Sequence, residues 1–191
     1  MEERQLNEKE SLELIAGMIQ NTQQKLEKGN GIPFLVWGYT TIVVSLLVWY
    51  FLSRTGDYRM HYLWFLIPLV AGPVMFFLIR KDEKGVKTYI DRVVGYVWTV
   101  MGLTGFMISM VAIFFWNLPI LFIIILLMGS GTAITGLVIR FTPIAVAGFL
   151  GLALSLLCLF TPGVNQILVF AAVFLVMMVI PGHILNAKGR K

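Results

Sequence analysis

Residues 118–139, LPILFIIILLMGSGTAITGLVI, form an unbroken apolar stretch without Asp, Glu, Lys or Arg. An α-helix rises about 1.5 Å per residue, so about 20 apolar residues cross a hydrocarbon core about 30 Å thick. Five more stretches of this kind occur, and each can form a spanning helix. The sequence therefore predicts an all-α, polytopic membrane protein with six transmembrane helices, at residues 32–52, 62–79, 93–116, 118–139, 143–160 and 164–185.

Lys and Arg are unevenly distributed between these stretches. The N-terminal segment, the second and fourth connections and the C-terminal tail hold 13 of the 15, and the first connection holds Arg54 and Arg59. Short loops rich in Lys and Arg stay cytoplasmic, so both termini are predicted to be cytoplasmic. The net charge of +5 reflects this topology. A nucleic-acid-binding protein would need a basic domain or stripe, which the sequence lacks, so the lipid bilayer is the expected partner.

The segment before the first span, residues 1–31, is predicted to form a cytoplasmic amphipathic helix. Asn7 and Glu10 have the spacing of a capping box, and Gly-Asn-Gly at residues 29–31 marks the end. Four apolar residues share one face of this helix and are candidate partner-docking residues. They are Leu12, Ile15, Ile19 and Leu26.

Three surfaces are available to this apolar face. It can dock on the cytoplasmic loops of the same chain, pair with a second copy or a partner protein, or lie on lipid. A helix that binds anionic lipid is usually rich in Lys and Arg on its polar face. Six acidic residues against four basic ones precede the first span, which disfavours lipid.

The spans are expected to form one domain, residues 32–185, followed by a basic cytoplasmic tail, residues 186–191. Very short connections between spans three to six make consecutive helices antiparallel neighbours and predict a compact bundle. Glycine followed by an aromatic residue recurs near the start of the odd-numbered spans, a pattern that three helical hairpins would produce. Small residues, Gly102 and Gly105 among them, recur in the third, fourth and fifth spans and indicate close helix packing.

Six residues within the spans are candidates for a cavity or a hinge. Prolines in the second span can kink the helix and free backbone carbonyls. Hydroxyl side chains in the fourth span can line a weakly polar cavity. A histidine near the cytoplasmic end of the sixth span is the one His, Asp, Glu, Lys or Arg residue within the predicted spans. These candidates are Pro68, Pro73, Ser130, Thr132, Thr135 and His183.

The sequence contains no recognisable catalytic, metal or cofactor motif. A zinc protease would need His-Glu-x-x-His, but the chain has two histidines, far apart, and the few acidic residues lie outside the spans. We therefore expect a non-enzymatic protein without cofactor that acts through protein partners or self-association. The alternative is a small transporter or channel for a neutral or apolar solute. A membrane enzyme of unrecognised type is a third hypothesis, which convergence of polar groups around His183 would favour.

The opening of the chain carries a resemblance to a known group. Residues 7–41, NEKESLELIAGMIQNTQQKLEKGNGIPFLVWGYTT, combine a short polar helix with Pro-Phe-Leu and Trp-Gly-Tyr at the entry to the first span. This stretch resembles the opening of uncharacterised small multi-pass inner-membrane proteins of Bacteroides-type bacteria. The resemblance covers about the first fifth of the chain. It implies a bacterial inner-membrane protein and supplies no catalytic or binding residues.

Overall fold

The computed structural model describes residues 31–81, 89–115 and 118–188. Within these ranges six helices are long and apolar enough to cross a membrane, which confirms the predicted spans and indicates a multi-pass membrane protein. The six are Gly31–Thr55, Tyr58–Leu78, Tyr89–Phe114, Ile120–Val138, Thr142–Phe160 and Gly163–Lys188. The predicted N-terminal helix lies outside the described residues.

The first four elements are long and mostly regular. Helix α2 spans Gly31–Thr55, and a 3-10 helix, η1, covers Tyr58–Phe65 before α3 at Leu66–Lys81. Asp57 starts η1, because its Oδ1 accepts a hydrogen bond of 2.9 Å from the Arg59 backbone N–H. Helix α4 spans Tyr89–Phe114.

The second half contains α5, Ile120–Val138, and two interrupted spans. The fifth span is α6, Thr142–Ser155, followed by α7, Leu157–Phe160. The sixth starts with a short 3-10 helix, η2, Gly163–Asn165. It continues through α8, a π-helical segment η3 and α9, which are Gln166–Phe174, Leu175–Val179 and Ile180–Lys188. Helix α9 thus reaches three residues into the segment assigned to the tail.

The π-helical segment lies immediately before a proline. Pro181 has no N–H and cannot continue the α-helical bond pattern, and the Ile180 N–H bonds to the Leu175 carbonyl five residues earlier. π-Helix is rare and occurs mostly as single turns of this kind inside α-helices, where it can kink the helix. The irregularity of the sixth span is therefore a π turn on the N-terminal side of Pro181.

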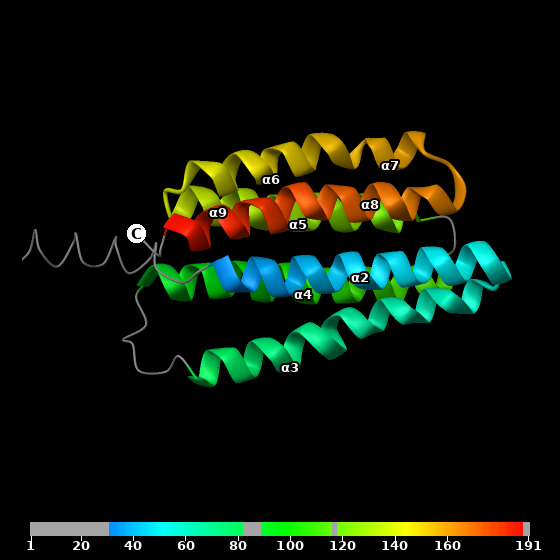
Figure 1. Ribbon diagram of the computed structural model, residues 1–191, viewed down its shortest axis with the longest axis horizontal. Coiled ribbons are helices and arrows are strands. Elements are labelled where there is room, and N and C mark those ends of the chain that lie inside the picture. Colours follow the sequence, from blue (N-terminus) through cyan, green and yellow to red (C-terminus); the bar gives the residue numbers. More distant parts are fainter. Residues whose placement is uncertain (1–30, 82–88, 116–117, 189–191) are drawn as a thin grey trace, which may run out of the picture.

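The helices differ in how many neighbours they have. The most extensive contact joins α5 to α6, while α2 packs against α8, η3 and α9. Helix α4 packs against α5, and α3 packs against α2 and η1. Figure 1 shows α3 at one edge, diverging from α2 toward its C-terminal end. The tightest contact therefore joins two spans that the three-hairpin pattern would assign to different hairpins.

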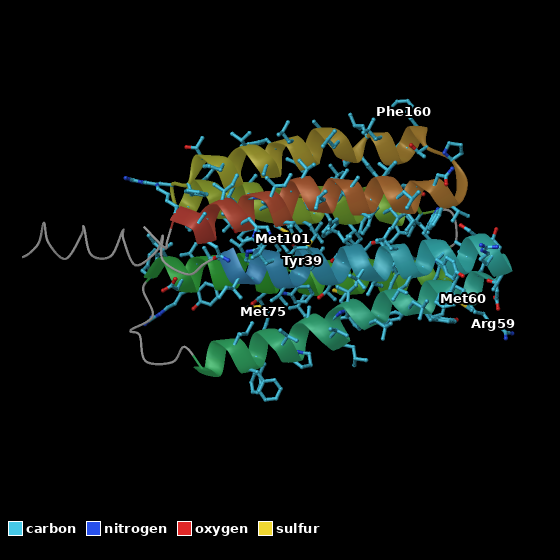
Figure 2. The ribbon with its side chains drawn as sticks, viewed as in Figure 1. Tyr39, Arg59, Met60, Met75, Met101 and Phe160 are labelled. Atoms are coloured by element: carbon cyan, nitrogen blue, oxygen red, sulfur yellow. The ribbon has the colours of Figure 1, made fainter. Side chains whose placement is uncertain are left out.

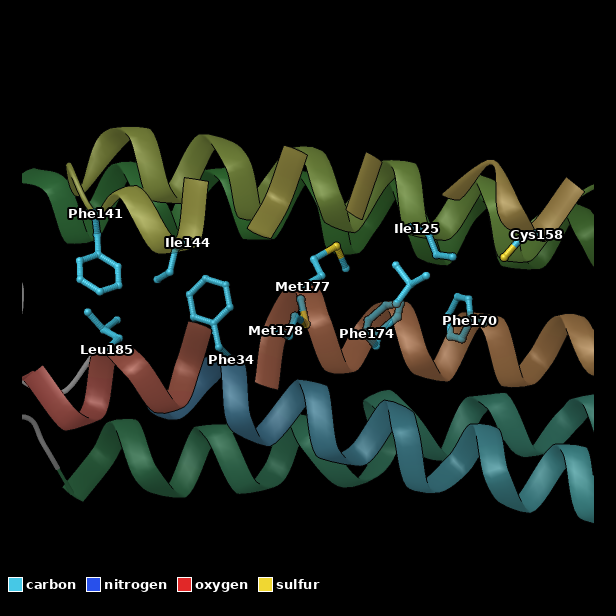
Figure 3. Close-up of a cluster of buried hydrophobic side chains, with 11 residues drawn as sticks. Phe34, Ile125, Phe141, Ile144, Cys158, Phe170, Phe174, Met177, Met178 and Leu185 are labelled. Atoms are coloured by element: carbon cyan, nitrogen blue, oxygen red, sulfur yellow. The ribbon is translucent and has the colours of Figure 1, made fainter. Parts of the chain in front are cut away.

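The main buried cluster is assembled from α2, α5, the fifth span and the sixth span, and several of its members are seen in Figure 3. Among the described side chains, α3 and α4 contribute no fully buried large residue to it. Trp98 of α4 and Trp64 of η1 pack at its margin. The cluster consists of Phe34, Ile125, Phe141, Ile144, Cys158, Phe170, Val173, Phe174, Met177, Met178 and Leu185.

Candidate functional site

The four candidate docking residues of the N-terminal segment, Leu12, Ile15, Ile19 and Leu26, lie outside the described residues. The six candidates within the spans are described. They fall on three separate helices, α3, α5 and α9, and so have to be considered one helix at a time.

The hydroxyl groups of α5 mostly bond within their own helix. Ser130 donates to the Leu126 carbonyl at 2.8 Å, and Thr135 donates to the Gly131 carbonyl at 2.7 Å. Such bonds to the preceding turn satisfy a hydroxyl in an apolar environment. Thr135 also accepts a hydrogen bond of 3.1 Å from Nε1 of Trp98. This bond links α4 to α5.

Thr132 differs from its neighbours on α5. Its side chain is fully buried, and its Oγ1 has no hydrogen-bond partner among the described residues. Thr132 lies two helical turns after Ile125 and therefore on the same face of α5. Ile125 belongs to the buried apolar cluster (Figure 3), so Thr132 faces the core.

The prolines lie on a different side of the molecule from these hydroxyls. Pro68 is in the first turn of α3 and Pro73 is inside it, and both are exposed. Because α3 packs against α2 and η1, and α5 packs against other helices, the structure does not bring the two sets together. The two best-formed pockets of the described chain lie elsewhere, lined by none of the six candidates.

His183 has a partner on another helix. Its Nε2 lies 2.7 Å from the hydroxyl of Tyr39 on α2, and the two rings meet edge to face, with centroids 5.9 Å apart. Close packing at Gly182 supports this pair, because a methyl group there would lie 3.1 Å from Cβ of Phe34 and 3.0 Å from Leu35. Sequence reasoning found His183 but missed Tyr39, since 144 residues separate them.

Helices α3 and α4 present large apolar faces. In the most apolar windows of the second span, η1 with α3, and of α4, 6% of the residues are buried, compared with 39% in α2, α5 and the fifth span and 56% in the sixth. Side chains along the outer edge of α3 project away from the other helices (Figure 2). These outward faces have no partner among the described residues, and lipid or another protein has to cover them.

One face of α4 is built from small residues. Gly95, Thr99 and Gly102 lie about one turn apart, and no atom of the described chain would come within 4 Å of a methyl group added at either glycine. Thr99 donates to the Gly95 carbonyl at 2.8 Å, which keeps its side chain close to the helix. The adjacent face, which turns toward α5, is packed, because a methyl group at Gly105 would lie 3.3 Å from Leu127 of α5. We call Gly95, Thr99 and Gly102 the open α4 face.

No three His, Cys, Asp or Glu side chains come together in the described ranges, so we assign no metal ligands there. Comparison of the chain with protein-family models, with curated proteins and with solved structures found no match.

Proposed function

We propose that this chain is a non-enzymatic, multi-pass protein of the bacterial inner membrane that acts by lateral association with a second copy or a partner protein. The low burial of α3 and α4 carries the proposal, because these two spans make few contacts within one chain. The other four spans supply a packed bundle that holds α4 in place through the Trp98–Thr135 hydrogen bond.

The open α4 face favours a helix as the occupant. In a bilayer, lipid chains are as apolar as leucine, so association depends on close packing, and small residues let two backbones approach. Gly95, Thr99 and Gly102 offer that approach on a surface that the chain itself leaves uncovered. The predicted amphipathic helix at residues 7–28 adds a second association element on the cytoplasmic side.

We further propose that both termini are cytoplasmic. The asymmetry of Lys and Arg supports this orientation, and the described chain begins and ends at the same end of the molecule (Figure 1). Single cysteines at Thr55 and Val164 should react with an impermeant thiol reagent from outside. Cysteines at Lys28 and Lys191 should react only after permeabilisation, and the reverse pattern would overturn the proposal.

Disulfide crosslinking in native membranes tests lateral association. The chain has one cysteine, buried Cys158, and Cys158→Ala provides a background without thiols. In it, Gly102→Cys should form an intermolecular disulfide under mild oxidation. Phe149→Cys is the matched control, because Phe149 is also exposed and lies near the middle of α6 but outside the open α4 face.

A third variant, Ile19→Cys, tests the N-terminal segment in the same way. Adducts from Gly102→Cys or Ile19→Cys that exceed those from Phe149→Cys support association through the corresponding surface. If neither exceeds the control, encounters are random collisions and the proposed function is wrong. The transporter alternative has no supporting observation among the described residues, because the prolines of α3 and the hydroxyls of α5 lie on helices that do not pack together.

A further inference from the structure

A pocket of about 470 Å³ lies at the end of the molecule where α5 ends, α6 begins and α9 ends. Its walls come from the turn between α5 and α6 and from the last turns of α9, segments more than 40 residues apart in sequence. Because helices that cross a bilayer end near its surface, this pocket lies at the level of the lipid headgroups. It is lined by Arg140, Phe141, Thr142, Pro143, Ile184, Ala187 and Lys188.

The pocket combines positive charge with an apolar wall. Arg140 and Lys188 bring two cations to this lining from different elements. The Lys188 ammonium lies 5.4 Å from the centroid of the Phe141 ring, which holds the charge over the pocket. Phe141 itself is buried against Leu185 in the core (Figure 3), so close packing holds in place the ring that forms the base of the pocket.

The backbone presents Arg140 outward. Arg140 is in the left-handed region at φ 55°, directly after α5. The Phe141 N–H bonds to the Gly136 carbonyl at 2.9 Å and the Arg140 N–H to the Leu137 carbonyl at 3.2 Å, the two bonds of a Schellman motif. Glycine is the usual residue at this position because it has no Cβ. Replacing Arg140 by glycine should therefore preserve the turn.

We propose that this pocket binds the headgroup of an anionic phospholipid. Basic pockets between membrane helices at the bilayer surface bind phosphate-bearing headgroups, and here Arg140 and Lys188 would pair with the phosphate. The apolar wall favours a lipid over a soluble anion. Exposed Val146 on α6 and Ile180 at the start of α9 lie one turn from Pro143 and Ile184 of the pocket, along the path that an acyl chain would take.

Retention of added lipid by the detergent-solubilised full chain, measured by native mass spectrometry, tests the proposal. Phosphatidylglycerol should be retained in preference to zwitterionic phosphatidylcholine. Since each Lys or Arg near a membrane surface contributes about 1 kcal/mol, Arg140→Gln and Lys188→Gln should each weaken retention about fivefold. Arg140→Gly should weaken it as much as Arg140→Gln, with the same unfolding midpoint as the unaltered chain or a higher one.

Arg54→Gln is the matched control. Arg54 also lies over an aromatic ring, 5.8 Å from the centroid of Tyr50. It is in the last turn of α2, at the opposite end of the molecule from the pocket (Figure 1). This variant should retain phosphatidylglycerol normally. Equal losses in Arg54→Gln and Arg140→Gln, or no loss in either pocket variant, would overturn the proposal. Displacement of the lipid by an equal concentration of glycerol phosphate would also overturn it, because the pocket would then recognise a soluble anion.

Discussion

The fourth and fifth spans, which contain α5 and α6, and the second and third spans, which contain α3 and α4, are all apolar enough to cross a bilayer, but they meet their surroundings in opposite ways. In the α5 and fifth-span windows 39% of the residues are buried, and in the α3 and α4 windows 6%. The difference lies in where the glycines are. Apolarity determines that a helix can span, and small residues in contact with a neighbour determine which spans pack closely.

The α5–α6 contact depends on two reciprocal pairs. A methyl group at Gly136 would collide with the backbone of Ala145, and one at Gly148 would collide with the backbone of Ala133. Gly136 and Ala133 are one turn apart on α5, and so are Ala145 and Gly148 on α6, which is the register of an antiparallel pair. Gly72 on α3 and Gly95 on α4 meet no atom of the described chain within 4 Å.

The largest expected effect is therefore at the α5–α6 contact. In Gly148→Ala the new methyl group would lie 2.6 Å from Cα of Ala133. Because that neighbour is backbone, the helices have to separate, at a cost of about 1–3 kcal/mol, as in other overpacked cores. Denaturation of the detergent-solubilised protein with sodium dodecyl sulfate measures the loss.

Gly102→Ala on the open α4 face is the control for this variant. No described atom obstructs its methyl group, and alanine is favoured over glycine in a helix by about 0.5–1 kcal/mol. Measured on the monomeric chain at a high ratio of detergent to protein, so that the proposed association does not contribute, its free energy of unfolding should be unchanged or slightly higher. Equal losses in the two variants would mean that the contrast between the packed and the peripheral helices is wrong.

A smaller effect is expected where the peripheral helix is attached to the packed pair. Thr135→Val removes the acceptor of the Trp98 indole N–H, now 3.1 Å away, and leaves a partly buried donor without a partner. The cost should be about 1 kcal/mol, since hydrogen bonds between membrane helices are modest. The same denaturation measures it, and a loss near zero would show that packing alone holds α4 on α5.

Thr132→Val is the matched control, one turn earlier on the same helix. Its hydroxyl is buried and has no hydrogen-bond partner among the described residues. Valine has the same shape without the polar atom, so this variant should be as stable as the unaltered chain or more stable by up to about 1 kcal/mol. A loss comparable to that of Thr135→Val would indicate that Thr132 has a partner, such as a buried water.

The positions of the spans could be predicted from the sequence because about 20 residues without charge are a local signal. The lateral arrangement could not. Gly102 and Gly105 were both interpreted as packing residues, but Gly105 contacts α5 and Gly102 meets no described atom. Periodicity does not separate a protein-facing face from a lipid-facing face, because both surroundings are apolar.

The polar contacts between helices could likewise not be predicted from the sequence. Thr135 and His183 were candidates from residue type alone, and the structure gives each a partner on another helix. Trp98 and Tyr39 carry no local signal for these pairings, because the partners are 37 and 144 positions apart in the sequence. The pocket beside Arg140 was missed for a similar reason, since its two cations meet only when α9 returns to the end of α5.

The smallest effect is expected at the exposed link between α2 and α9. Tyr39→Phe keeps the ring but removes the hydroxyl that lies 2.7 Å from Nε2 of His183. Close packing holds these helices together without it, because methyl groups at Gly38 and Gly182 would lie 3.1 Å from Met178 and Phe34. The free energy of unfolding should therefore fall by less than about 1 kcal/mol, as for other exposed hydrogen bonds.

The ¹⁵N resonance of His183 Nε2 should nevertheless shift in Tyr39→Phe. The control Tyr50→Phe, which keeps the ring that faces Arg54, should leave this resonance unchanged. A loss of stability as large as that of Gly148→Ala would mean that this hydrogen bond, rather than the glycine contacts, joins the first span to the last.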